Sequence, residues 1–314
     1  MIMTLHTLFG IDNQTLKFMQ KPTLEVVTNL TTKFLSKIRV HIHLLLAAVK
    51  NFSMRWNSML RHWKFFIISN FKRILEDFFS TQDMNIPMDE VIKLNNLTAG
   101  RDKLARLLQY ASRAVWYFLQ KRNLNQKSMD KLKNLEYHLS TFRKLLRLGR
   151  SLDVLYGALN SLHYSDRIVS ATSSMSKVAH ALYLLCDHII WFSRVGLMDV
   201  RSDQWLETAN RYWLYSIVMS LVRDLYELQK ILKSQQYKFN TKNLSLFSRE
   251  LSRFAVGHKD VVLDSLKNLC DVFIPLAALG YVKLSPGTVG VLGVISSAAG
   301  LYALIDPFAK LAPS

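Results

Sequence analysis

The residues of this chain best suited to chemistry are Cys186, Asp187 and His188, which place a nucleophile, an acid and a base in adjacent positions. Consecutive residues of a helix point about 100° apart, so these three side chains cannot act on one another. The simpler interpretation is the polar face of a helix beside a buried cysteine. We therefore predict no catalytic site at this triplet.

Other candidate sites are also incomplete. His41 and His43 have the spacing of a strand but no third ligand for a metal ion. Gly287, Gly290 and Gly293 lack the preceding strand and the Lys-Ser or Lys-Thr pair of a nucleotide-binding loop. The two cysteines of the chain form no Cys-x-x-Cys motif. The sequence therefore predicts a protein that is not an enzyme and that holds no cofactor and no metal.

A membrane function is indicated by the segment from Thr141 to His163. Leucines recur there at steps of three and four residues, the spacing of one helix face: Leu145, Leu148, Leu152, Leu155, Leu159 and Leu162. Four cations occupy other positions of the same segment: Arg143, Lys144, Arg147 and Arg150. Such a helix seats in the headgroup layer of an anionic phospholipid membrane and bends it as a wedge. The alternative is a bundle helix whose leucines face the core.

The elements that position this segment are expected to be helices. The chain has 314 residues, half of them hydrophobic, with only 11 Gly and 6 Pro, which excludes a disordered chain and argues against a turn-rich β fold. Its formal net charge of +18 favours an anionic partner. We predict an all-α protein, an amphipathic helical bundle at the membrane surface with a C-terminal membrane-inserted helix or hairpin.

The C-terminal region contains the strongest membrane signal. From Leu284 to Ile305 there is no charged residue and no histidine, and about 20 apolar residues suffice for a helix to cross a bilayer. A buried core helix is the alternative. The shorter uncharged run from Val272 to Val282, which contains Pro275, precedes it. The end of the chain is therefore either a hairpin that dips into the membrane or a single crossing with an interfacial lead-in.

Small residues within this run predict a surface for self-association. Gly290, Gly293, Ser297 and Gly300 are separated by steps of three, four and three, so they lie along one side of a helix. Small residues allow the close backbone approach on which helix association in lipid depends. The alternative is that they are scattered small residues of any membrane helix.

Two further apolar helices are expected, from Val178 to Met198 and from Tyr212 to Leu232. The first contains Asp187, and the second contains Arg223 and Asp224. A charge near the centre of a membrane span costs about 2.5 to 3.5 kcal/mol on insertion scales. We therefore expect these helices at the membrane surface or in a helical core.

Changes in composition divide the chain into four regions. Residues 1–87 are basic, without an acidic residue between Glu25 and Glu76, and differ in composition from the rest of the chain; Met88 is an alternative start. Residues 88–233 form the amphipathic helical region, 234–260 a polar linker and lead-in, and 261–314 the membrane-inserted segment.

Five blocks of sequence after Met88 form a specific set. They are RDKLARLLQYASR (101–113), RKLLRLGRSLDVLYGAL (143–159), LYLLCDHIIWFSRVGL (182–197), RYWLYSIVMSLVRDLYEL (211–228) and NLCDVFIPLAALGYVKLSPGTVGVLG (268–293). By these blocks the chain resembles the peroxin-11 family of peroxisomal membrane proteins from about Met88 to Ile305. Residues 1–87 lie outside the family pattern.

The resemblance implies a location in the peroxisomal membrane, crossed once or several times. Proteins of this family insert an amphipathic helix, elongate the organelle, self-associate and promote its division with a fission adaptor and a dynamin-related GTPase. Carried over to this chain, the remodelling helix is the one in the segment from Thr141 to His163. Both termini of family members face the cytosol, which implies either a second span, for which the helix with Asp187 is the candidate, or a C-terminal hairpin.

Two other functions agree less well with the sequence. A channel for small metabolites would need polar residues that face one another at membrane depth, so it would have to recruit the helices with Asp187 or Arg223 and Asp224. Nucleic-acid binding is disfavoured by the bilayer-length apolar run. Membrane remodelling is the leading hypothesis.

Overall fold

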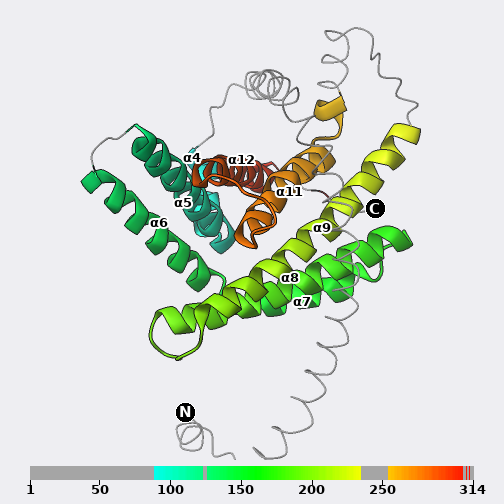
Figure 1. Ribbon diagram of the computed structural model, residues 1–314. Coiled ribbons are helices and arrows are strands. Elements are labelled where there is room, and N and C mark those ends of the chain that lie inside the picture. The colour runs from blue at the N-terminus through cyan, green and yellow to red at the C-terminus, as the bar shows by residue number, and fades with distance from the viewer. Residues whose placement is uncertain (1–87, 123–125, 235–253, 307–308, 310, 312–314) are drawn as a thin grey trace, which may run out of the picture. The chain divides into compact units, whose positions relative to one another are not determined.

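The computed structural model describes residues 88–122, 126–234, 254–306, 309 and 311. The predicted N-terminal extension and most of the predicted polar linker lie outside these residues. Within them the regular structure is helical, which confirms the predicted all-α class (Figure 1). The helices are α4 (Met88–Asn96), α5 (Thr98–Lys121), α6 (Gln126–Leu146), α7 (Arg150–Ser161), α8 (Arg167–Arg194), α9 (Ser202–Ser234), α11 (Lys259–Ala278) and α12 (Pro286–Ile305).

The helices pack as two groups. In the first, α5 contacts both α6 and α12, and α12 also contacts α11. In the second, α8 lies between α7 and α9 and packs along both (Figure 1). Contacts of α11 with α9 and of α6 with α8 join the two groups. Ion pairs of Lys144 at the end of α6 and of Asp264 in α11 connect the two groups.

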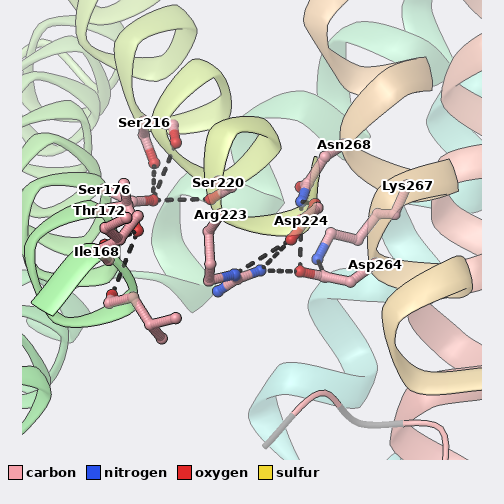
Figure 2. A network of polar contacts seen from close by, with 11 residues as sticks. Ile168, Thr172, Ser176, Ser216, Ser220, Arg223, Asp224, Asp264, Lys267 and Asn268 are labelled. Atoms are coloured by element: carbon pink, nitrogen blue, oxygen red, sulfur yellow. Dashed lines mark hydrogen bonds and ion pairs between the residues drawn. The ribbon is translucent and has the colours of Figure 1, made fainter. Parts of the chain in front are cut away.

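Helices α8 and α9 approach closely through small residues. Ser176 of α8 donates a hydrogen bond to the carbonyl oxygen of Ser216 at 2.9 Å, and its hydroxyl lies 2.8 Å from that of Ser220 (Figure 2). Asp166 caps α8 by accepting from the amide of Ile168 at 2.9 Å. Hydroxyl contacts between closely packed helices are typical of helix pairs in apolar surroundings.

The two apolar helices expected from the sequence are α8 and α9, and both begin earlier than predicted. The aspartates that interrupt their apolar runs are directed inward, since Asp187 and Asp224 are each only 1% exposed. The two helices pack against each other, and α9 also packs against α11. Of the two predicted locations, the membrane surface and a helical core, this packing supports the core.

The C-terminal region forms a helical hairpin. Helix α11 begins at Lys259, well before the uncharged run that starts at Val272, and ends where Gly280 adopts a φ of 77°. Ser285 then caps α12 by accepting from the amide of Thr288 at 3.1 Å. Among the described residues α12 is the one helix long and apolar enough to cross a membrane, which agrees with the predicted membrane-inserted segment.

Candidate membrane-binding surface

The segment from Thr141 to His163 is not one continuous helix, so that prediction is wrong. Helix α6 ends at Leu146 and α7 begins at Arg150. Between them Gly149 has a φ of 80°, in the left-handed region that glycine adopts most easily. The amide of Leu152 donates to the carbonyl of Gly149 at 3.1 Å and starts the new helix. The glycine thus makes an elbow between α6 and α7.

The predicted leucine row nevertheless stays on the outside of the described chain. Its members on α6, the elbow and α7 are all at least 45% exposed, and Leu152 is 70% exposed. Tyr156 of α7, at 68%, extends the same apolar surface. Large apolar side chains gathered on one exposed side mark a site for a membrane or another protein. We call this the leucine surface: Leu145, Leu148, Leu152, Leu155, Tyr156, Leu159 and Leu162.

The opposite side of α7 is small and polar. Ala158 and Ser161 are buried against α8. Ser174 of α8 donates to the carbonyl of Ala158 at 3.3 Å, and Lys177 donates to that of Gly157 at 3.1 Å. Because α7 is attached to α8 through these contacts, its leucines are not needed for packing within the chain.

Three of the four predicted headgroup-binding cations are directed inward instead of toward a membrane. Arg143 donates to Asp102 of α5 at 3.0 Å. Lys144 forms an ion pair with Asp187 of α8, and Arg147 contacts the same carboxylate at 2.6 Å. All three cations are buried. Arg150 alone among the four remains partly exposed, so the prediction of a cationic flank is corrected to a single arginine.

Electrostatics keep this buried cluster charged. Burial alone would raise the pKa of Asp187, but Arg147 and Lys144 hold it below its usual value. Burial lowers the pKa of Lys144 to about 8, a shift that Asp187 opposes. The Arg147 guanidinium also donates to the Tyr183 hydroxyl at 2.8 Å. The cluster therefore clamps the end of α6 to α8 and fixes the elbow that leads into α7.

A second buried cluster joins α9 to α11 (Figure 2). Arg223 of α9 donates to its neighbour Asp224 at 2.7 Å and also forms an ion pair with Asp264 of α11. Asn268 donates to Asp224 at 2.7 Å. In the sequence alone, Arg223 and Asp224 are only interruptions of an apolar helix. The signal that could have found this cluster is Asp264 and Asn268, one turn apart on the helix that receives them.

The side of α12 predicted for self-association is covered by α5 of the same chain. A Cβ on Gly290 would lie 2.7 Å from the backbone nitrogen of Ala114, and one on Gly293 would lie 2.2 Å from the Tyr110 ring. Ser297 is fully buried. Further pairs place Gly287 on Tyr117 and Gly300 on Lys103, an antiparallel register. The small residues therefore hold α12 to α5, and this placement of the interface is corrected.

The triplet at Cys186 does not converge. Asp187 faces Lys144 and Arg147, whereas the His188 Nε2 atom lies 2.9 Å from the Arg147 carbonyl oxygen. Cys186 packs in an apolar cluster, and burial raises the pKa of its thiol to about 11. A thiol in that state is a poor nucleophile at neutral pH. The described residues contain no group of three or more His, Cys, Asp or Glu that could hold a metal ion.

Comparison with known proteins assigns most of the chain to one family. Residues 88–305 match the family model described as Peroxisomal biogenesis factor 11 (PEX11). The chain is 31% identical to Peroxisomal membrane protein 11B of Bos taurus, over 72% of this chain and 100% of the relative. It is 33% identical to Peroxisomal membrane protein 11A of Homo sapiens, over 71% and 99%, and 28% identical to Peroxisomal biogenesis factor 11 of Schizosaccharomyces pombe, over 68% and 92%. No solved structure matches the chain.

Proposed function

Since this chain belongs to the peroxisomal biogenesis factor 11 family, which confirms the resemblance seen in its sequence blocks, we propose that it bends and elongates the peroxisomal membrane before division. As a family member it is a peroxisomal membrane protein involved in peroxisome biogenesis. The proposal concerns the physical step that it performs there.

The observation that carries the proposal is the leucine surface of α7. In water such a row would be unfavourable, whereas in the outer part of a leaflet each buried apolar side chain is stabilised by removal from water. A helix of 12 residues is too short to cross the bilayer and lies along its surface. Insertion of α7 expands one leaflet relative to the other, which bends the membrane.

The ion-pair clamp supports this role. Asp187 fixes Lys144 and Arg147 just before the elbow, so α7 is presented from a rigid base. A helix inserted from a rigid base transmits its displacement of lipid to the attached bundle. The membrane-crossing α12 would hold that bundle at the bilayer.

The proposal also specifies the partners. The first is the anionic phospholipid membrane, approached by the leucine surface and by Arg150. Elongation over a large area needs many wedges, so we propose self-association through a surface other than the covered side of α12. A fission adaptor and a dynamin-related GTPase would act on the elongated membrane. Nucleic acid is not proposed as a partner.

The test is vesicle tubulation by the full chain reconstituted into anionic vesicles. Leu152→Glu with Leu159→Glu places two carboxylates on the leucine surface and should abolish tubulation while leaving the helical content unchanged. Leu225→Glu with Leu269→Glu is the matched control, because these leucines of α9 and α11 are 65% and 54% exposed. Tubulation by the α7 variant at the level of the unaltered chain would refute the proposal.

A channel for small metabolites is the second candidate, because charged residues of different helices face one another in the interior of the described bundle. The carboxylates of Asp102, Asp187 and Asp264 are, however, each held by two cations. Paired charges of this kind fasten helices rather than line a conducting path. Leakage of a small solute from the same vesicles, without change in their shape, would favour the channel.

A further inference from the structure

The ammonium of Lys103 on α5 forms no ion pair with a carboxylate of the described residues. Its side chain lies over Gly300 of α12, where a Cβ would be 3.1 Å from the Lys103 Nζ atom. No ion pair or hydrogen bond joins Lys103 to another of the described residues. The side chain is only partly exposed. An ammonium group in such a position lacks both full hydration and a counter-ion.

The charges around Lys103 are mostly of the same sign. Arg106 lies one turn later on α5, and Lys267 approaches from α11. Burial together with these two cations lowers the pKa of Lys103 to about 7, against the opposing effect of Asp271 and Asp102. Helix α12 contributes no charge to the site, because its sequence contains none.

The nearby carboxylates are already occupied. Asp271 forms an ion pair with Arg106. Asp102 accepts from Arg143 at 3.0 Å and lies 3.8 Å from Arg147. The third carboxylate, Asp264, is shared by Lys267 and Arg223. The group as a whole therefore has an excess of positive charge, centred on Lys103.

We propose that Lys103, assisted by Lys267 and Arg106, binds a phosphate group beside the C-terminal end of α12. Phosphate supplies several strong acceptor oxygens for ammonium and guanidinium donors. Gly300 is five residues from the end of α12 at Ile305, about 8 Å along the helix axis. The flexible stem of a lysine lets its ammonium move part of that distance toward the headgroup layer.

Two sources offer the same chemistry. A lipid headgroup would be bound if the C-terminal end of α12 lies at the headgroup layer of the membrane. Free phosphate or a soluble phosphate ester would bind through the same kind of oxygen atoms. The site is separate from the leucine surface and does not depend on the remodelling proposal. Vesicle tubulation tests that proposal, whereas acylation and thermal melting test this site.

The first measurement is protection of Lys103 from acylation in the unaltered full chain, solubilised in detergent and analysed by mass spectrometry. Inorganic phosphate in one arm, and phosphatidic acid in place of phosphatidylcholine in the other, should slow acylation of Lys103 at least several-fold. Lys121, exposed at the other end of α5, is the internal control and should react at an unchanged rate. Protection by phosphatidic acid alone identifies a lipid headgroup, and protection by inorganic phosphate identifies a site open to soluble anions.

The second measurement uses Lys103→Met. Removal of an unpaired ammonium should raise the Tm of the full chain in the absence of phosphate, and the variant should lose the further rise that the protecting anion gives the unaltered chain. Lys121→Met should keep that rise. The proposal is overturned if neither anion protects Lys103, or if Lys103→Met retains the anion-dependent rise in Tm.

Discussion

Helices α7 and α12 both turn small residues toward a neighbouring helix of the chain, yet the covered sides are built differently. Under α7 the contacts are hydrogen bonds from Ser174 and Lys177 to backbone carbonyls. Under α12 they are close contacts of glycines with the Tyr110 and Tyr117 rings and the Ala114 backbone. Helix α7 is therefore attached to α8 through hydrogen bonds, whereas α12 is held against α5 by close steric contact.

The difference indicates what each helix can tolerate. Substitutions on the outer side of α7 change what the helix touches outside the chain, so their effect should be on membrane binding. Substitutions on the glycine side of α12 collide with α5, so their effect should be on folding. Soluble proteins place most of their large apolar residues inside, whereas the leucines of α7 are outside, an arrangement suited to lipid surroundings.

The largest expected effect comes from Asp187→Ala, which removes the carboxylate that pairs with Lys144 and Arg147 before the elbow to α7. Lys144 and Arg147 would remain buried without their carboxylate, and leaving a buried charge unpaired costs about 3 to 5 kcal/mol. The free energy of unfolding in detergent micelles should fall by that amount. Glu207→Ala is the control, because Glu207 pairs with Arg211 on the surface with both side chains 55% exposed; it should change stability by less than about 1 kcal/mol. Equal effects of the two variants would contradict the clamp.

The next largest effect is expected from Gly293→Leu, which tests the glycine side of α12 that contacts α5. A side chain at this position would enter the Tyr110 ring, and overpacking of this kind costs about 1 to 3 kcal/mol or more. We expect a lower Tm and poorer membrane insertion of the full chain. Gly257→Leu is the control, since a Cβ at Gly257 meets no atom within 4 Å. Normal stability of Gly293→Leu, with loss of crosslinked oligomers, would return the interface to this side of α12.

The helical class, the membrane-length helix and the leucine row could be predicted because they depend on local composition and periodicity. The ion-pair partners of the cations in this segment could not be predicted. Arg143 and Lys144 find Asp102 and Asp187 at sequence separations of 41 and 43 residues, and periodicity within one segment contains no information about such partners.

The prediction for the glycine side of α12 failed for the same reason. Spacing correctly placed Gly290 and Gly293 on one side of a helix, but it could not say whether a second copy or another helix of the chain covers that side. Tyr110 and Ala114 lie on α5 with matching spacing, and only the fold brings them opposite the glycines. Gly149 is a different case, because a leucine row that continues on both sides conceals a single residue able to bend the helix.

A further effect, gradual with pH, concerns His180 of α8. Burial, together with the positive charges of Arg147 and Arg150, lowers the pKa of His180 to about 3. The unfolded chain binds this proton near pH 6.5, so the free energy of unfolding should fall as the pH drops from about 6.5 to 4, by at most about 1.4 kcal/mol per pH unit. His180→Gln should flatten this dependence, whereas His163→Gln, at an exposed position, should not. An unchanged slope in His180→Gln would show that other groups cause it.

The smallest effect is expected from replacing a glycine by alanine, either at the elbow or inside α7, and the two positions should respond differently. Gly149→Ala forces a Cβ into left-handed backbone with a φ of 80°, which costs about 1 to 2 kcal/mol even though no atom lies within 4 Å. Gly157→Ala, inside α7, meets only the Lys177 Cδ atom at 4.0 Å and should stabilise by about 0.5 to 1 kcal/mol through helix propensity. Opposite signs in chemical denaturation are therefore expected. Stabilisation by both variants would mean that the segment forms the continuous helix that its leucine spacing suggests, and that the elbow is not required for the position of α7.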